Sequence, residues 1–278
     1  MLQKRFITAA WAIPVTGVII WFGEPYFTIL FALVGLLAIA EFYRLSDNVK
    51  GTTLTAFGIL WTVLFILIRN PKLQSLIDPY ISFDLLMPLL ITSGMAVSLL
   101  ALLMRKQKQG AFNIWAWTFA GILYIGWLLG YAVALRGLDG GRSWVFLAIF
   151  ATFGSDTAAF FIGRAFGKHK LAPSISPGKT WEGSIAGLFG AVIITLFFLL
   201  PTPVQLSAYL NWWQAVVLGV LVSAFGQLGD LVESLFKRNA GVKDSGRLFP
   251  GHGGVLDRLD SIVFAVVVVY YWALWSTL

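Results

Sequence analysis

Long apolar segments recur along the whole chain, and this pattern constrains its fold more than any other feature. We distinguish nine of them in the 278 residues, each about 17–25 residues long, which is enough for a helix to cross the hydrocarbon of a membrane. Only 12% of the residues are charged, against about 25% in a typical soluble domain. The sequence therefore predicts an all-α, polytopic integral membrane bundle of about nine transmembrane helices. The predicted spans are 6–23, 26–43, 53–69, 84–104, 112–135, 144–163, 183–200, 213–236 and 259–277.

Lysine and arginine are unequally divided between the two sides of this predicted bundle. With the N-terminus in the cytoplasm, sixteen fall on the cytoplasmic side and four, Arg69, Lys72, Arg136 and Arg142, on the other. The positive-inside rule favours this orientation, which predicts an integral protein of the cytoplasmic (inner) membrane with a site facing the cytoplasm. The net charge of +7 is then mostly topological, so we expect no nucleic acid partner.

The two halves of the chain differ in character. Residues 1–135 have apolar spans with charges near the span ends, and we interpret them as a scaffold that contacts lipid or another subunit. Glu41 and Arg44, three residues apart, are expected to form a local ion pair. Residues 136–278 have acids within the spans and are predicted to be catalytic, with cytoplasmic loops 164–182 and 237–258.

Carboxylates at membrane depth need a partner or a wet cavity, because each costs a few kcal/mol there. Asp156 lies within span six, Asp230 and Glu233 within span eight, and Asp260 at the start of span nine. Asp156 and Asp230 fall at similar depth, roughly 10 Å below the cytoplasmic surface at 1.5 Å per residue. They predict a shared polar pocket open to the cytoplasm, with a plain interhelical hydrogen bond or salt bridge as the alternative.

The segment 229–261 concentrates acids, bases and glycines. Asp230, Glu233 and Lys237 are spaced to share one helical stripe, and Asp257 precedes Asp260 by three residues. Oxygen ligands from two helix ends suit a hard divalent cation such as Mg²⁺. The alternative is a set of helix-end ion pairs, although the surplus of bases also favours an anionic substrate rich in phosphate. The bases of the segment are Lys237, Arg238, Lys243, Arg247 and Arg258.

Two loop features favour phosphate binding. Glycines in 241–254 allow backbone N–H groups to approach phosphate oxygens. His252, between two glycines, could be a general base, a phosphate ligand or a structural hydrogen-bonding residue. Lys179 and Thr180 lie at the N-terminal side of span seven, where a helix favours anions. Gly183 and Gly187 form a G-x-x-x-G pattern that favours close helix packing in lipid.

Together these residues carry a resemblance to a known family. The segment 229–261 closely resembles the signature of the CDP-diacylglycerol synthases (phosphatidate cytidylyltransferases), and 155–183 resembles the corresponding region of their bacterial members. The residues that fill the signature are Ser234, Lys237, Arg238, Lys243, Asp244, Gly246, Phe249, Pro250, His252, Gly253, Gly254, Asp257, Arg258 and Asp260. The resemblance implies a membrane enzyme that joins CTP and phosphatidate, releases diphosphate, uses Mg²⁺ and possibly a second cation, and forms a homodimer.

This resemblance, together with the charge pattern, gives each residue an expected role. The expected catalytic residues are Asp230, Asp257, Lys237, Arg238 and Asp260. The expected substrate-binding residues are Asp156, Lys179, Thr180, Lys243, Asp244, His252, Gly253, Gly254 and Arg258. The expected metal ligands are Asp230, Asp257, Asp260 and Glu233. Two alternatives stay open: a CTP-dependent lipid kinase of the dolichol or phytol type, which would attack the γ-phosphorus, and an ion-coupled transporter, against which the lack of inverted repeats argues.

Overall fold

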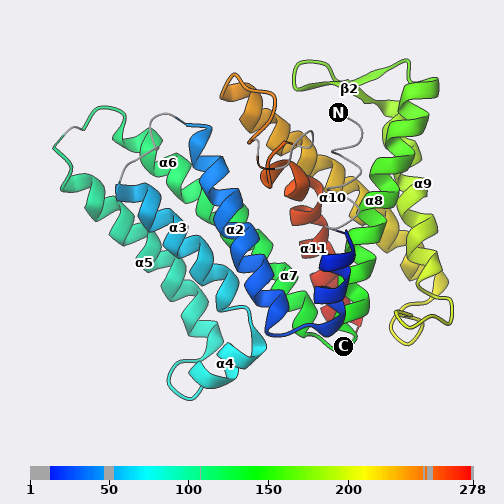
Figure 1. The fold of residues 1–278 in the computed structure, drawn as a ribbon, viewed down its shortest axis with the longest axis horizontal. Coiled ribbons are helices and arrows are strands. Elements are labelled where there is room, and N and C mark those ends of the chain that lie inside the picture. Colours follow the sequence, from blue (N-terminus) through cyan, green and yellow to red (C-terminus); the bar gives the residue numbers. More distant parts are fainter. Residues whose placement is uncertain (1–12, 47–52, 107, 247, 249–252, 277–278) are drawn as a thin grey trace.

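The computed structural model of the protein describes residues 13–46, 53–106, 108–246, 248 and 253–276. Within these ranges the chain is mostly helical (Figure 1). A first helix, Ile13–Phe22, precedes the labelled ones. The labelled elements are α2 (Tyr26–Arg44), α3 (Thr53–Leu67), α4 (Pro71–Ile77), α5 (Phe83–Leu103), α6 (Ala111–Gly121), η1 (Ile122–Trp127), α7 (Leu128–Gly137), α8 (Gly141–Phe166), β1 (Lys170–Ala172), β2 (Ser176–Thr180), α9 (Trp181–Phe197), α10 (Trp212–Asn239) and α11 (Leu256–Ser276).

The lengths of these helices identify a polytopic helical membrane protein. Six are long and apolar enough to cross a membrane, and there are seven if the bent pair α3–α4 is one span. The six are α2, α5, the continuous α6–η1–α7, α8, α10 and α11, whereas Ile13–Phe22 and α9 are shorter apolar helices. Helices occur at the positions of all nine predicted spans, the first of which begins outside the described residues. How many of them cross the membrane stays a prediction.

The connections predicted to face the cytoplasm gather at one end of the bundle. In Figure 1 the hairpin that contains β2 lies at the upper end, together with the connection between α10 and α11 and the start of α6. Helix α4 lies at the opposite end. This separation agrees with the alternation of the predicted spans. The side of the membrane that each end faces, and the cytoplasmic N-terminus, stay predictions.

Aromatic packing fixes α2 against the second half of the chain. The ring of Phe42 is fully buried, and its centroid lies 5.3 Å from that of Phe236 on α10. It also lies 6.0 Å from the ring of Tyr124 in the π-helical segment η1. The hydroxyl of Tyr43 donates a hydrogen bond to the carbonyl of Thr118 on α6. The upper end of α2 is therefore held beside α10. The π-helical segment η1 is also informative, because such segments are often found near functional sites.

A short β-hairpin departs from the all-α prediction. Strands β1 and β2 pair antiparallel, with Lys170 opposite Thr180 and Ala172 opposite Ser176, inside the predicted loop 164–182. The hairpin leads directly into α9, because the hydroxyl of Thr180 caps that helix by accepting a hydrogen bond from Gly183 N–H at 3.2 Å. A side-chain oxygen at this position satisfies one of the free N–H groups of a helix start.

The G-x-x-x-G pattern lies where α9 packs on α8. A Cβ atom at Gly183 would lie 2.7 Å from the carbonyl oxygen of Ala159, and one at Gly187 would lie 3.0 Å from Ser155 Oγ. Larger residues at either position would push the two helices apart. The predicted close packing is therefore confirmed, and it brings Asp156 of α8 near the hairpin that precedes α9.

Candidate active site

Lys237 is a buried lysine held between two carboxylates. Its Nζ forms an ion pair with Glu233 one turn earlier on α10 and lies 2.6 Å from Asp257 Oδ1 on α11. The side chain of Glu233 is fully buried. A buried charge is costly unless it is paired, so these three side chains act as one unit that links α10 to the start of α11. The helix-end ion pairs that the sequence left open are thus present.

Asp257 organises the connection between α10 and α11. Its Oδ2 accepts hydrogen bonds from Gly254 N–H at 2.8 Å, from Ser245 N–H at 3.0 Å and from Ser245 Oγ at 2.9 Å. Gly253 has a φ of +81°, a left-handed conformation that favours glycine. Both carboxylate oxygens of Asp257 are therefore occupied, one by Lys237 and the other by the two ends of the loop.

A second group of acids surrounds Lys179 of β2. The Nζ of Lys179 lies 2.6 Å from Asp230 Oδ2, and Ser234 donates to Asp230 Oδ1 at 3.3 Å. Asp156 interacts electrostatically with both Asp230 and Lys179. Asp260 interacts electrostatically with Asp230 and Asp156. Acids of α8, α10 and α11 therefore interact electrostatically with one another, and Asp230 is the one that pairs with Lys179. The shared pocket stays a prediction.

Asp156 and Asp230 lie further from the ends of their helices than from the ends of the predicted spans, because α8 and α10 extend beyond those spans. Asp156 lies ten residues before the end of α8 at Phe166, and Asp230 lies nine residues before the end of α10 at Asn239. At 1.5 Å per residue both are roughly 15 Å from the helix ends. Their depths remain alike.

The hairpin is fastened to both neighbouring elements. Arg238 donates from Nε to the carbonyl of Ile175 at 3.1 Å and from Nη1 to the carbonyl of Val242 at 2.9 Å. The carboxylate of Glu182 lies 2.7 Å from His169 Nδ1. Hydrogen bonds from its own backbone N–H and from the His169 side chain lower the pKa of Glu182 to about 2. Glu182 is therefore ionised throughout the physiological range, and its link to the hairpin is kept.

The other expected site residues fall into three groups. Lys243, Asp244 and Arg258 are exposed, whereas Thr180 is buried and caps α9. His252 lies outside the described residues. Within the described ranges, no three acidic or histidine side chains lie close enough together to hold one metal ion, so the four expected ligands do not form one cluster. They lie in the two neighbouring groups around Lys237 and Lys179.

Comparison with known proteins identifies the family of the chain. The model of the cytidylyltransferase family matches residues 3–275. The chain belongs to the cytidylyltransferase family. It is 37% identical to a phosphatidate cytidylyltransferase of Brucella suis, over 97% of this chain and 92% of the relative. It is also 32% identical to one of Bacillus subtilis, over 97% of both chains, and 35% identical to one of Staphylococcus haemolyticus, over 95% of this chain and 96% of the relative.

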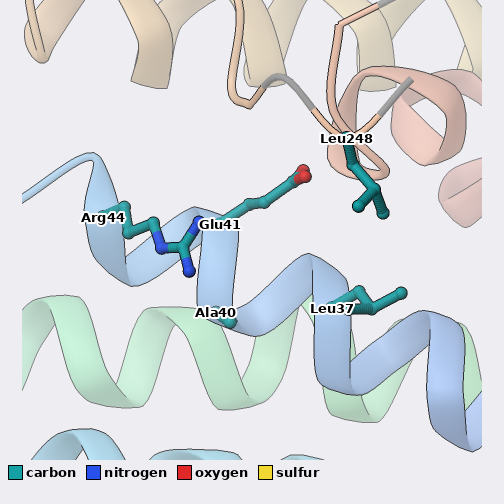
Figure 2. A pocket seen from close by; sticks show the side chains of 5 residues that line it. All are labelled: Leu37, Ala40, Glu41, Arg44 and Leu248. Carbon is teal, nitrogen blue, oxygen red and sulfur yellow. The ribbon is translucent and has the colours of Figure 1, made fainter. Parts of the chain in front are cut away.

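The residues around Asp257 also contact an acid to which the sequence analysis gave another partner. The expected ion pair between Glu41 and Arg44 is wrong: in the part of the chain that the structure describes, Glu41 accepts hydrogen bonds from Ser245 and Leu256. Figure 2 shows its carboxylate directed toward the connection that holds Leu248, away from the guanidinium of Arg44. Glu41 is 5% exposed. A lone acid on an apolar helix was the signal that could have indicated this contact.

Tyr124 is a second contribution of the N-terminal half. Its hydroxyl is buried and has no hydrogen-bond partner, and it interacts electrostatically with Glu233, Asp260 and Asp230. Its ring centroid lies 5.4 Å from that of Phe236. Tyr124 therefore forms part of the wall around the acids. The division of the chain at residue 135 stays a prediction, but both parts contact the site.

Proposed function

We propose that this protein transfers CMP from CTP to phosphatidate, giving CDP-diacylglycerol and diphosphate. The observation that supports the proposal most strongly is the pairing of Lys237 with both Glu233 and Asp257 inside the segment that resembles the family signature. Relatives named phosphatidate cytidylyltransferase cover nearly the whole chain. The protein should form CDP-diacylglycerol from CTP and phosphatidate in detergent micelles, and mass spectrometry should detect no such product when phosphatidate is left out.

The chemistry is a substitution at phosphorus. An oxygen of the phosphatidate phosphate forms a bond to the α-phosphorus of CTP, and the bond from that phosphorus to the bridging oxygen of the diphosphate breaks. A phosphate monoester is mostly dianionic at pH 7, since its second pKa is about 6, so a strong general base is unnecessary. The protein's task is to place two anions together and to offset their charge.

Basic side chains at the cytoplasmic end fit that task. Lys179 is 23% exposed and reaches the acids from β2, and Arg238, Lys243 and Arg258 are exposed around the same end. We assign these four to the phosphates of CTP and phosphatidate, because cationic donors bind phosphate oxygens strongly. The side chain of Lys237 is more buried than that of Lys179, and it supports Asp257. Thr180, Asp244 and His252 stay as further predictions for substrate contact.

Magnesium is the cofactor that these residues would bind. A second bound cation stays a prediction. Lys179 and Lys237 each place an ammonium group 2.6 Å from a carboxylate oxygen, so a cation already fits at each of these acids, and carboxylate oxygens suit Mg²⁺. Asp230 is the better ligand, because Asp257 already accepts four hydrogen bonds, and phosphate oxygens and waters would supply the other ligands. Bound there, the metal would offset negative charge on the phosphates. Glu233 would support Lys237.

We further propose a site that faces the cytoplasm and opens sideways to the inner leaflet, so that the acyl chains stay in the bilayer. The similar depth of Asp156 and Asp230 and the gathering of basic connections at one end support it. The homodimer implied by the resemblance stays a prediction, which the mass of the purified protein in detergent would test.

The orientation can be tested by cysteine labelling, since the chain has no cysteine. Ser174 and Val242 are exposed at the proposed cytoplasmic end, and Tyr80 is exposed near α4 at the other end. Ser174→Cys and Val242→Cys should resist an impermeant maleimide added to intact spheroplasts and react after lysis. Tyr80→Cys should react from outside. The reverse pattern would overturn the orientation. Ser245, which is buried, is unsuitable for this purpose.

Asp156 provides a test of the shared pocket. Asp156→Leu should insert normally but turn over about 10- to 100-fold more slowly, the usual loss when a residue supporting a metal or phosphate site is removed. The physical reason is that the site loses a charge that interacts with Asp230, Lys179 and Arg258. The matched control is Asp84→Leu, at an exposed acid near the start of α5. Equal turnover of the two variants would remove Asp156 from the site.

A further inference from the structure

Glu41 of α2 joins the N-terminal half of the chain to Ser245 and Leu256, which lie after α10 and at the start of α11. Its Oε2 accepts a hydrogen bond from Ser245 Oγ at 3.1 Å and another from Leu256 N–H at 2.9 Å. These partners are 204 and 215 residues away in the sequence. Both contacts are buried, so water cannot readily replace the carboxylate.

The contact with Leu256 gives α11 its N-terminal partner. Leu256 is the first residue of α11, where a helix has N–H groups without acceptors inside the helix. A carboxylate at this position satisfies one of them and interacts favourably with the positive end of the helix. Asp257 is the next residue, so Glu41 fixes the backbone from which the Asp257 side chain extends.

The contact with Ser245 links Glu41 to the carboxylate of Asp257 by a second route, through the Ser245 hydroxyl. Ser245 Oγ lies 3.1 Å from Glu41 Oε2 and 2.9 Å from Asp257 Oδ2. A serine hydroxyl carries one proton and can donate to only one of them at a time. Ser245 therefore stands between the two acids, while its backbone N–H stays with Asp257.

Two glycines of the signature leave room for Glu41. A Cβ atom at Gly246 would lie 2.5 Å from Glu41 Oε1, and one at Gly254 would meet Glu41 Oε2 and lie 2.5 Å from Ser245 Oγ. The small residues at these positions are therefore explained by the carboxylate that lies against them. Beside it is a cavity of about 340 Å³, lined by Glu41, Leu37, Ala40, Arg44 and Leu248 (Figure 2).

We propose that Glu41 is a positioning residue of the active site, which holds Ser245 and the start of α11 so that Asp257 and Lys237 keep their places. This inference rests on the proposed function for its kinetic consequences, but not for its structural ones. The Oε2 atom of Glu41 accepts from Ser245 and Leu256, so we assign Glu41 no contact with the phosphates. It acts through Ser245, Leu256 and Asp257, and it makes α2 part of the catalytic apparatus.

The kinetic test compares Glu41→Ala and Glu41→Gln in purified protein. Glu41→Ala removes both acceptors and should lower kcat per folded molecule by about 10- to 100-fold, the usual effect of losing a residue that orients a ligand. The KM for CTP should change much less. Glu41→Gln keeps one acceptor oxygen and should recover part of kcat. Arg44→Ala and Asp84→Asn are the controls and should turn over like the wild type. Unchanged kcat in Glu41→Ala would overturn the proposal, as would an equal loss in Arg44→Ala.

A double-mutant cycle separates positioning from general destabilisation. Gly246→Ala should reduce turnover in the wild-type background, because the new methyl group meets the Glu41 carboxylate. In the Glu41→Ala background the same substitution should cost little more, since the obstacle is gone; such non-additivity is the mark of residues in contact. Additive losses would show that Gly246 and Glu41 act independently and would contradict the proposal.

Hydrogen exchange gives a readout that does not depend on activity. In Glu41→Ala, the peptide covering residues 253–258 should exchange faster than in the wild type, whereas peptides of α5 should not change. If the wild type made no CDP-diacylglycerol while this difference was present, the proposed function would fail and the positioning role would stand. If exchange were unchanged, the positioning role would fail whatever the activity.

Discussion

Asp257→Asn is expected to lower the rate of CMP transfer by about 100-fold or more, the upper part of the range for removing a group that orients or stabilises charge at a site. Both oxygens of Asp257 act as acceptors, Oδ1 from Lys237 and Oδ2 from Ser245 and Gly254. An asparagine in either orientation places its NH₂ group against a donor. The substitution thus removes either the hydrogen bond from Lys237 or those from Ser245 and Gly254, while it changes the size of the side chain very little.

The measurement for this prediction is kcat of purified Asp257→Asn, with the folded fraction determined by size-exclusion chromatography in detergent. Asp84→Asn is the matched control, since it makes the same chemical change at an exposed acid far from the site. If Asp257→Asn keeps more than half of the wild-type kcat, the loop it organises does not matter for the reaction. Loss in both variants would point to a general effect of the substitution.

Lys237→Met is expected to destabilise the fold as well as to abolish activity. It leaves the fully buried carboxylate of Glu233 without its cation and removes the partner of Asp257 Oδ1. Breaking a buried ion pair from one side costs about 3–5 kcal/mol, because an uncompensated charge remains. The expected result is a clear fall in the apparent Tm of the detergent-solubilised protein.

The double variant Lys237→Met with Glu233→Gln distinguishes the two effects. Glu233→Gln removes the unpaired charge of Glu233 but not that of Asp257, so part of the lost Tm should return, while activity should stay low because Asp257 has lost its lysine. A double variant as unstable as Lys237→Met alone would contradict the role given to Glu233 as the buried partner. Recovery of activity would contradict the role given to Lys237.

The helices were predictable because long apolar runs leave few alternatives in a membrane protein. The run 84–104 corresponds to α5 at Phe83–Leu103, and 26–43 corresponds to α2 at Tyr26–Arg44. Helices whose ends carry polar residues extend beyond their apolar runs, as α8 does at both ends. The hairpin at 170–180 was not predictable, because β2 reads Ser-Pro-Gly-Lys-Thr, which lacks the alternation typical of a strand.

Within the site, local spacing was informative and long-range contact was not. The spacing of Asp230, Glu233 and Lys237 placed them on one helix face, and the structure shows the pair of Glu233 with Lys237 there. The contacts of Glu41 join residues more than 200 positions apart. One sequence offers no spacing rule for such a contact, and an arginine three residues later suggested a nearer partner.

The position of the label that passes from CTP to lipid tests the central claim most directly. Purified protein is given phosphatidate with CTP labelled at either the α- or the γ-phosphorus, and the lipid and aqueous products are separated. We expect the α-label to enter the lipid and the γ-label to leave in diphosphate, with Asp257→Asn slowing both and Asp84→Asn slowing neither. Entry of the γ-label into lipid would identify a CTP-dependent kinase, and the absence of the α-label from lipid would contradict CMP transfer.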